Sequence, residues 1–362
     1  MMRLLRPPTT PIGLDFGSRY VKAAQLARLP NGWRIEALAK VPRSDPAGPL
    51  TANEVLRVKS AIARQGFLGC RVVLAAPNDV ATTNLLDLPP NSPDDSIEQM
   101  ARMEVARVRR ISPDSFEMSC WRAGGQAGGR NAGRVMAVAC PHQQANQLLD
   151  LFEGAGFEVE ALDAPPCALA RACRTLLSEQ GDIVPIVDIG WHAAWLLLLA
   201  RGEVAYHRTL GDCGMGSLVA QAAGRFHLEP RAAEQLLEGV NLTSRQQPRP
   251  LGESDDQAGL EMARLARRHF HAMIDELRTS LSYASSQHQG KIGRLVLTGG
   301  CANMPGLAEH LAGKSGLEAS VAAPADLAEC DPSVLARSAD AALTQAVGLA
   351  QFQAAARQGE TE

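Results

Sequence analysis

The chain has 362 residues, a length that suggests about two domains. Hydrophobic residues make up 46% of it, which excludes a chain that is disordered as a whole. The 36 Lys and Arg residues and the 39 Asp and Glu residues give a net charge of -3. That balance argues against a protein that binds nucleic-acid phosphates through a basic surface.

The sequence predicts neither a membrane-spanning helix nor a secretory signal. The apolar run over residues 193–200 is far shorter than the ~18 residues that a bilayer-spanning helix needs. Residues 1–11 contain no apolar segment of the kind that a secretory signal carries. The 8 cysteines form no C-x-x-C pair, and several lie in apolar runs such as residues 138–141. We therefore expect reduced thiols in a cytoplasmic protein.

The N-terminal part of the chain predicts an α/β unit. Residues 11–26 predict a strand, a glycine-rich turn and a second strand, because an apolar stretch is interrupted by glycine and then continues in an extended pattern. Asn31-Gly32 is a favourable hairpin turn that predicts a third strand after it. A helix over residues 53–65 and a buried strand over residues 71–76 complete this unit.

From about residue 78 to residue 160 the pattern changes. A strand ends before Pro89-Pro90, and a helix with one apolar face follows and runs to about Arg110. A glycine-rich hairpin loop leads to a strand over residues 134–140 and a helix over residues 143–154. This stretch predicts a compact α+β subdomain inserted into a larger lobe.

A second cycle begins at residue 183 and resembles the first. An apolar strand again runs into an Asp-x-Gly turn and then into another strand, which places Asp188 in the position of Asp15. The offset is 188 − 15 = 173 residues, too long for a solenoid repeat, so it predicts two similar lobes. We assign the first lobe to residues 1–182 and the second to residues 183–362.

The remainder of the second lobe is predicted as helices around one further strand. Residues 215–240 predict helices, residues 241–259 a polar loop, and residues 260–286 a long amphipathic helix. A strand then enters the pair Gly299-Gly300, and a final helix over residues 343–355 packs back on the first lobe.

The two Asp-x-Gly turns carry the chemistry. A glycine beside a strand end lets backbone N–H groups approach a phosphate, and an aspartate at the same place can hold Mg²⁺, usually through water. Two such turns in facing lobes would hold a polyphosphate from both sides, with Gly299 and Gly300 allowing close approach of a base or ribose.

Three segments resemble the motifs of the actin-like ATPase superfamily. Asp15-Phe16-Gly17-Ser18 resembles its first phosphate motif, Asp188-Ile189-Gly190 its second, and residues 297–307 its adenosine motif. Within that superfamily the chain is most similar to the type IV pilus assembly protein PilM family. That likeness extends over nearly the whole chain and includes residues 13–22, Leu86-Asp87-Leu88-Pro89 before a helix, and Asp163 ahead of residues 168–172.

The resemblance implies an α/β fold of the actin-like, or ribonuclease H-like, type with two lobes and an inserted subdomain like that of the cell-division protein FtsA. It implies ATP and Mg²⁺ as cofactors. The implied cofactor-binding residues are Asp15, Gly17, Ser18, Lys22, Asp188, Gly190, Glu234, Gly299, Gly300 and Asn303, with Asp15 and Asp188 as the metal ligands. For Lys22, a lysine on the strand surface is an equally good interpretation.

The resemblance also implies a cytoplasmic scaffold at the inner membrane. Its partner would be the cytoplasmic N-terminal tail of an inner-membrane PilN-like protein, seated beside the inserted subdomain. Membrane contact would come only through that partner, nucleic acid would not be bound, and self-association is left open.

The sequence departs from the family pattern at two places. Trp191-His192 follows the second turn, where the family has a hydroxyl residue, and Leu237 stands where a lysine follows Glu234. A scaffold that has lost nucleotide binding is therefore an alternative. A small-molecule kinase or ATPase is another, with Asp163 as the candidate general base. A filament-forming protein like FtsA is a third, but residues 358–362 offer no amphipathic membrane helix.

Two groups of arginines remain. One, at residues 107, 109 and 110, ends a predicted helix, where cations interact favourably with the helix dipole. Arg264, Arg267 and Arg268 are interpreted in the same way, with a partner-binding patch as the alternative.

Overall fold

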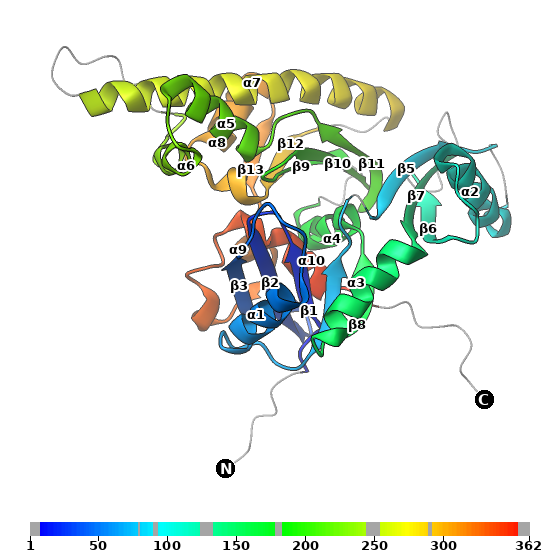
Figure 1. The fold of residues 1–362 in the computed structure, drawn as a ribbon. Coiled ribbons are helices and arrows are strands. Elements are labelled where there is room, and N and C mark those ends of the chain that lie inside the picture. Colours follow the sequence, from blue (N-terminus) through cyan, green and yellow to red (C-terminus); the bar gives the residue numbers. More distant parts are fainter. Residues whose placement is uncertain are drawn as a thin grey trace.

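The computed structural model describes residues 8–78, 80–89, 93–123, 133–177, 183–243, 254–288 and 292–353. The chain forms two lobes, each built on its own β-sheet, and a smaller subdomain beside them (Figure 1). The second lobe lies above the first in this view, and the subdomain lies to the right.

The first lobe is built on a mixed sheet with the strand order β14-β3-β2-β1-β4-β8. Its strands are β1 (Ile12–Phe16), β2 (Tyr20–Leu29), β3 (Gly32–Pro42), β4 (Arg71–Ala75), β8 (Glu158–Asp163) and β14 (Glu329–Cys330). Strand β1 pairs antiparallel with β2 and parallel with β4, so the Asp-x-Gly turn after β1 lies at the carboxyl edge of the sheet centre.

The sheet of the second lobe repeats this arrangement. Its order is β11-β10-β9-β12-β13, with β9 antiparallel to β10 and parallel to β12. The strands are β9 (Ile183–Ile189), β10 (Ala194–Ala200), β11 (Glu203–Leu210), β12 (Arg294–Thr298) and β13 (Glu318–Val321). The repeat seen in the sequence is thus a repeat of sheet topology, with β9 in the place of β1.

Helices cover both faces of each sheet. In the first lobe, α1 (Ala52–Ala63) and α3 (His142–Gly154) pack on one face, while α4 (Pro165–Ala172) and α10 (Thr344–Ala350) pack on the other. In the second lobe, one face is covered by α5 (Met215–Phe226), α6 (Pro230–Glu238), α7 (Ser254–His288) and α8 (Leu307–Ser315). The other face packs against α4, so this helix lies between the two sheets.

The inserted subdomain is smaller than predicted. It contains a three-stranded antiparallel sheet, in the order β5-β7-β6, and α2 (Asp94–Arg109) on one face of it. The strands are β5 (Thr82–Asp87), β6 (Phe116–Arg122) and β7 (Arg134–Pro141). Helix α3 buries Phe152 in the first-lobe core, and β8 pairs with β4. The insert therefore spans about residues 82–141 rather than 78–160.

The return of the chain to the first lobe begins earlier than predicted. Besides α10, the short helix α9 (Pro324–Leu327) and β14 belong to the first lobe, since Leu327 joins its core and β14 pairs with β3. Helix α10 ends at Ala350, whereas we predicted a helix over residues 343–355, whose last two residues lie outside the described residues.

Glycines allow α10 to cross the sheet closely. A Cβ atom at Gly13 of β1 would lie 2.5 Å from the backbone N of Ala350, and one at Gly348 would lie 2.6 Å from the carbonyl carbon of Ala168 in α4. Neither position has room for a side chain, so this packing depends on glycine at both. The contact fixes β1, and with it Asp15, against the C-terminal part of the chain.

All eight cysteines are free thiols, as the sequence predicted. None of the helices in the described ranges combines the length and the apolar character that a membrane span requires.

Candidate functional site

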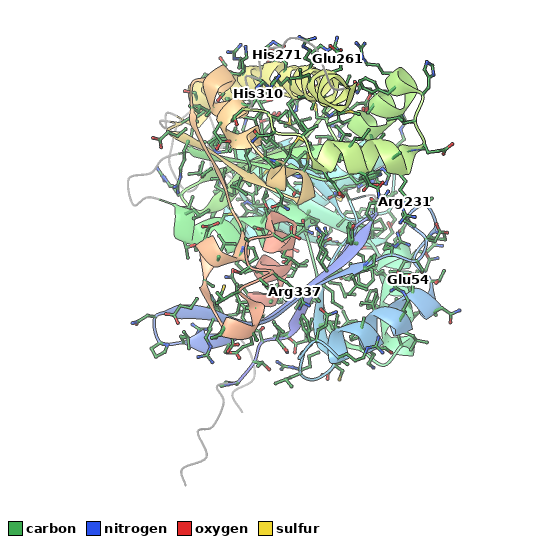
Figure 2. The ribbon with its side chains drawn as sticks, turned by 90° about the vertical axis from the view of Figure 1, so that its left-hand side faces the viewer. Glu54, Arg231, Glu261, His271, His310 and Arg337 are labelled. Carbon is green, nitrogen blue, oxygen red and sulfur yellow. The ribbon has the colours of Figure 1, made fainter. Side chains whose placement is uncertain are left out.

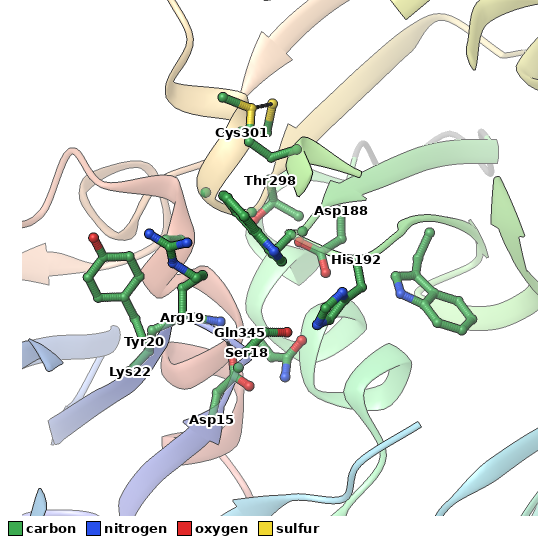
Figure 3. Close-up of a pocket in the computed structure, with 18 of the residues that line it drawn as sticks. Asp15, Ser18, Arg19, Tyr20, Lys22, Asp188, His192, Thr298, Cys301 and Gln345 are labelled. Atoms are coloured by element: carbon green, nitrogen blue, oxygen red, sulfur yellow. Dashed lines mark hydrogen bonds and ion pairs between the residues drawn. The ribbon is translucent and has the colours of Figure 1, made fainter. Parts of the chain in front are cut away.

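A cavity of about 730 Å³ lies between the two lobes. Its volume is within the range of small-molecule and cofactor sites. Figure 3 shows Asp15 reaching into it from the first lobe and Asp188 from the second. All the predicted cofactor-binding residues line this cavity: Asp15, Gly17, Ser18, Lys22, Asp188, Gly190, Glu234, Gly299, Gly300 and Asn303.

The first turn holds an ion pair. Asp15 at the end of β1 and Lys22 of β2 are cross-strand neighbours, and the Lys22 Nζ atom lies 2.5 Å from Asp15 Oδ2. Burial lowers the pKa of Lys22, but the attraction and hydrogen bond of Asp15, with weaker attraction from Asp188 and Asp340, outweigh burial and raise the pKa. Lys22 is therefore a fixed positive charge inside the cavity.

The second turn holds a carboxyl group that is poorly stabilised as an anion. Burial raises the pKa of Asp188 to about 6, Lys22 opposes the rise, and the negative charge of Asp15 adds to it. Its cross-strand neighbour in β10 is Trp195 rather than a cation. A cation that entered the cavity would find here a carboxylate whose charge is not yet compensated.

The glycine pair after β12 serves two different purposes. Gly299 has φ +86, and a Cβ atom on it would lie 2.7 Å from the carbonyl oxygen of Ile189, so the missing side chain allows β12 to approach β9. At Gly300 the nearest atom to such a Cβ would be that of Ala342, at 3.9 Å. Both glycines line the cavity, where we expected the close approach of a ligand, but only at Gly300 is the position of a side chain open.

Arg19 crosses from the first lobe to the second, which the sequence did not reveal. Its Nη2 atom donates to both carboxylate oxygens of Glu234 in α6, at 3.0 and 2.7 Å. Its guanidinium carbon lies 4.3 Å from the centre of the Trp191 ring. The only signal in the sequence was its place directly after Ser18.

Trp191 does not fill the second turn with its ring. Its carbonyl oxygen accepts a hydrogen bond from the backbone N of Gly216, at 2.8 Å, in the first turn of α5. A Cβ atom at Gly216 would lie 2.8 Å from the indole Nε1, so the ring packs on the start of that helix. The ring forms part of the cavity wall beside Arg19, and the turn keeps its backbone exposed to the cavity at Gly190.

A second contact between distant segments uses Asn303. Its Nδ2 atom donates to Asp340 Oδ1 at 2.7 Å, and its Oδ1 atom accepts from the backbone N of Ala341 at 3.0 Å. Asp340 Oδ2 in turn lies 2.8 Å from the Nζ atom of Lys40 in β3. The amide of Asn303 thus holds the segment that returns to the first lobe, which is a structural contact in addition to its place in the cavity wall.

The family model described as "Type IV pilus assembly protein PilM" matches residues 13–251 and 256–352. The chain belongs to the PilM family. The three motifs that resemble the phosphate and adenosine motifs all contribute residues to one cavity, and the family match extends over both lobes and the insert.

Solved structures agree with this family at the level of the fold. The structure described as "PilM-PilN type IV pilus biogenesis complex" is similar with a TM-score of 0.76 and 20% identity, over 94% of this chain and 97% of that one. The ethanolamine utilization protein EutJ from Carboxydothermus hydrogenoformans has a TM-score of 0.53 and 16% identity, over 98% and 93%.

MreB5 of Spiroplasma citri bound to AMPPNP is similar with a TM-score of 0.53 and 12% identity, over 94% of this chain and 95% of that one. These neighbours establish the actin-like fold. The comparison with curated proteins gives no match.

Asp163, the candidate general base, does not line the cavity of this PilM-family chain. It lies at the end of β8, and its Oδ2 atom pairs with Arg171 Nη1 at 2.9 Å. Arg171 also donates to the carbonyl oxygen of Gly348, at 2.6 Å. Burial raises the pKa of Asp163 although Arg171 opposes the rise. Asp163 therefore connects β8, α4 and α10, and the structure does not support it as a base over a bound substrate.

The end of the cavity beside β10 and β11 is uncharged. Trp195 and His207 stack there, with ring centres 5.0 Å apart and planes 9° apart. Burial lowers the pKa of His207 to about 4, so its ring is neutral at physiological pH. The charged side chains of the cavity wall are thus concentrated around the two turns and α6.

Proposed function

We propose that this chain is a scaffold of type IV pilus assembly that binds ATP with Mg²⁺ in the cavity between its lobes. Asp15 and Asp188 would hold the hydrated cation, since Mg²⁺ keeps several waters and needs only one or two carboxylates. The turns at Gly17, Ser18 and Gly190 would face the phosphates. The observation that carries the proposal is that two equivalent carboxylates from two lobes line one cavity.

The donor set fits a magnesium nucleotide. The Asp188 carboxyl has a raised pKa because of burial and the charge of Asp15, which Lys22 only partly opposes, and a divalent cation would supply further positive charge. Lys22 provides a positive charge beside the first turn for phosphate. Glu234, Gly300 and Asn303 lie on the part of the wall where the nucleoside would be, with Gly299 behind them against β9. The bound nucleotide would contact both lobes and hold them in one arrangement.

Titration calorimetry with ATP and Mg²⁺ tests the proposal. We expect heat of binding with the wild-type protein and none with Asp15→Ala. Because Asp15→Ala leaves Lys22 without its partner, Asp188→Asn serves as a second variant that removes a cation ligand without breaking an ion pair. Asp163→Asn, outside the cavity wall, is the matched control and should bind as the wild type does.

The absence of heat with the wild-type protein would contradict the nucleotide proposal and favour a scaffold without nucleotide. In that case the lack of nucleotide binding would be explained by the contacts of Arg19 with Trp191 and Glu234, which bring the two lobes together at the cavity wall. Steady phosphate release in the presence of a soluble acceptor would instead favour a small-molecule kinase or ATPase.

We further propose that the chain docks on the cytoplasmic N-terminal tail of an inner-membrane PilN-like protein, beside the insert. A relative solved as a PilM-PilN complex, similar over 94% of this chain, supports this partner. The chain would then lie at the cytoplasmic face of the inner membrane through its partner.

A synthetic peptide of such a tail, taken from a protein encoded beside this one, tests the docking. It should bind the full chain, and a scrambled peptide of the same composition should not. Equal binding of the two peptides would contradict a specific docking site.

A further inference from the structure

A group of arginines on the outer side of the second lobe takes no part in the proposed nucleotide site. Arg225 of α5 and Arg264, Arg267 and Arg268 of α7 surround a depression of about 340 Å³ together with Glu261. Figure 2 shows Glu261 and His271 on the outward side of α7, at the top of the molecule. We refer to these four arginines as the α7 arginine patch.

The sequence suggested that Arg264, Arg267 and Arg268 lie at the end of a helix, and their position in the structure excludes this explanation. Cations are favourable in the last turn of a helix, but α7 continues to His288, about five turns beyond Arg268. The helix dipole therefore gives Arg264, Arg267 and Arg268 no stabilisation, whereas Arg225 lies in the last turn of α5, where a cation is favourable. Their convergence with Arg225 from a second helix needs another reason.

The described residues of the patch include more positive side chains than negative ones. Glu261 is the single carboxylate among the described residues that line the depression, and it accepts hydrogen bonds from Arg264 and, at 3.2 Å, from Arg225. Arg267 is partly engaged, since its Nε atom donates to the carbonyl oxygen of Leu242 at 3.0 Å. Arg268 is exposed and forms no ion pair with any side chain in the described parts of the chain. Among the described residues of the patch, one carboxylate faces the guanidinium groups of Arg225, Arg264 and Arg268, which leaves a surplus of positive charge there.

One further cation, Lys314, lies in α8 near the patch. The pKa of His310 is lowered, first by burial and then by the positive charges of Arg267, Lys314 and His271. Its Nε2 atom is buried and has no hydrogen-bond partner among the described residues. Lys314 of α8 thus adds one cation beside the patch, in a chain whose overall charge is -3.

We propose that the α7 arginine patch is a docking site for an acidic segment of a partner protein. The paired guanidinium groups already seat one carboxylate, that of Glu261, which shows the chemistry that the geometry accepts. Arginine presents planar donors that match carboxylates in pairs, and it is preferred over lysine for such recognition.

A membrane surface is a poorer fit than an acidic peptide. Interfacial helices insert large apolar side chains beside their basic residues. The large exposed apolar residues within the described ranges are Leu56, Leu68, Met103, Val108, Leu236, Tyr283 and Leu335, and none belongs to the patch. The site is independent of the nucleotide cavity, so it stands whether or not ATP is bound.

Fluorescence anisotropy with a labelled peptide of alternating Glu and Ser tests the docking site on the full chain. The double variant Arg264→Glu and Arg268→Glu should weaken binding at least about tenfold, because it removes charge-assisted hydrogen bonds and adds repulsion. Arg107→Glu with Arg231→Glu makes the same change of charge at exposed arginines of α2 and α6, and should leave the affinity near that of the wild type.

Equal losses in the two double variants would overturn the proposal, since binding would then follow only the net charge. Wild-type affinity in the patch variant would overturn it as well. Phosphatidylglycerol vesicles form a separate arm: binding to vesicles but not to the peptide, with loss in the patch variant, would replace the protein partner by a membrane. Thermal unfolding of each variant establishes that it is folded, and Arg268→Ala, which removes a single exposed side chain, should show a smaller loss of the same sign.

Discussion

The two Asp-x-Gly turns share a sequence pattern and a sheet position, yet they differ in charge. Asp15 faces Lys22 across β1 and β2, whereas Asp188 faces Trp195 across β9 and β10 in the same register. Lys22 pairs with Asp15, and the pKa of Asp188 is raised to about 6 by burial. One substitution at the equivalent strand position, lysine against tryptophan, therefore makes the first turn a neutralised site and the second an uncompensated one.

The surroundings of the turns differ as well. The second turn supports the start of α5 through the carbonyl oxygens of Gly190 and Trp191, which accept from the backbone N atoms of Met215 and Gly216 at 3.0 and 2.8 Å. The first turn instead extends Arg19 across the cavity to Glu234. The two turns thus share a backbone path but differ in their side chains. The first lobe contributes the cationic side chains of Lys22 and Arg19, and the second lobe contributes the groups that lie opposite them, Asp188, Trp191 and Glu234.

The largest expected effect comes from breaking the ion pair of the first turn. Asp15→Asn leaves the ammonium of Lys22 buried beside a neutral amide, and the side chains of the pair are 10% and 20% exposed. We expect a loss of about 3–5 kcal/mol in the free energy of unfolding, the range for removing one partner of a buried pair. Urea denaturation measures it.

Lys22→Met combined with Asp15→Asn is the control for that loss. The double variant removes both charges, so it should recover much of the stability. A double variant as unstable as Asp15→Asn alone would show that the pairing is not the cause.

Removing the carboxylate of the second turn should raise the free energy of unfolding, whereas removing that of the first turn lowers it. The pKa of Asp188 in the folded chain, about 6, lies above the value of 3.8 for an isolated aspartate. The folded state then binds more protons between these pH values, so stability falls as pH rises through this window and the loss is complete above about pH 6. Asp188→Asn should therefore stabilise the nucleotide-free chain at pH 7 by about 3 kcal/mol at most.

Unfolding of wild type and Asp188→Asn at several pH values checks the sign. The difference should shrink as the pH falls toward 4. A variant that is less stable than the wild type at pH 7 would contradict the uncompensated carboxylate. A stabilised variant that also loses ATP with Mg²⁺ would indicate a carboxyl group kept for binding at the expense of stability.

Local sequence patterns were sufficient to predict much of the similarity between the two turns. The strand, the Asp-x-Gly turn and the following strand are contiguous in the sequence, so the equivalence of Asp15 and Asp188 and their place on one cavity could be predicted from it. The eight free cysteines and the paired lobes followed from composition and from the repeat.

What could not be predicted depends on contacts between distant residues. Arg19 and Glu234 are 215 residues apart, and no local signal connects them. The insert was predicted too long because α3 and β8 follow it without a break, although both pack on the first lobe. Asp163 was chosen for its residue type, but its partner Arg171 and the cavity wall are tertiary features. The arginines of α7 were interpreted as a helix end although the helix predicted over residues 260–286 already continued beyond them, and only the tertiary structure brings Arg225 of α5 to the same surface.

A smaller effect is expected where the two turns meet through Arg19. Its ion pair with Glu234 is partly exposed, with side chains 32% and 19% accessible, so solvent screening limits its contribution. Together with the contact on the Trp191 ring, we expect a coupling of about 1 kcal/mol between Arg19 and Glu234. A double-mutant cycle with Arg19→Ala and Glu234→Gln, followed by urea denaturation, measures it.

Additive losses in that cycle would mean that the two side chains do not stabilise each other. A coupling that disappears in 1 M salt but not in 0.1 M salt would agree with a screened surface pair.

The smallest effect on nucleotide binding and stability is expected at Asp163, which belongs to neither of the two turns. Its carboxylate lies behind the cavity wall in an ion pair with Arg171, so Asp163→Asn should leave the affinity for ATP with Mg²⁺ unchanged and any phosphate release at the wild-type rate. Stability should change only modestly, because the loss of the ion pair with Arg171 is offset by removing a carboxylate whose pKa burial raises. A large fall in phosphate release with unchanged affinity would restore Asp163 as a candidate base. It would also require the Asp163 carboxyl to leave Arg171 and reach the cavity, which it does not line in this structure.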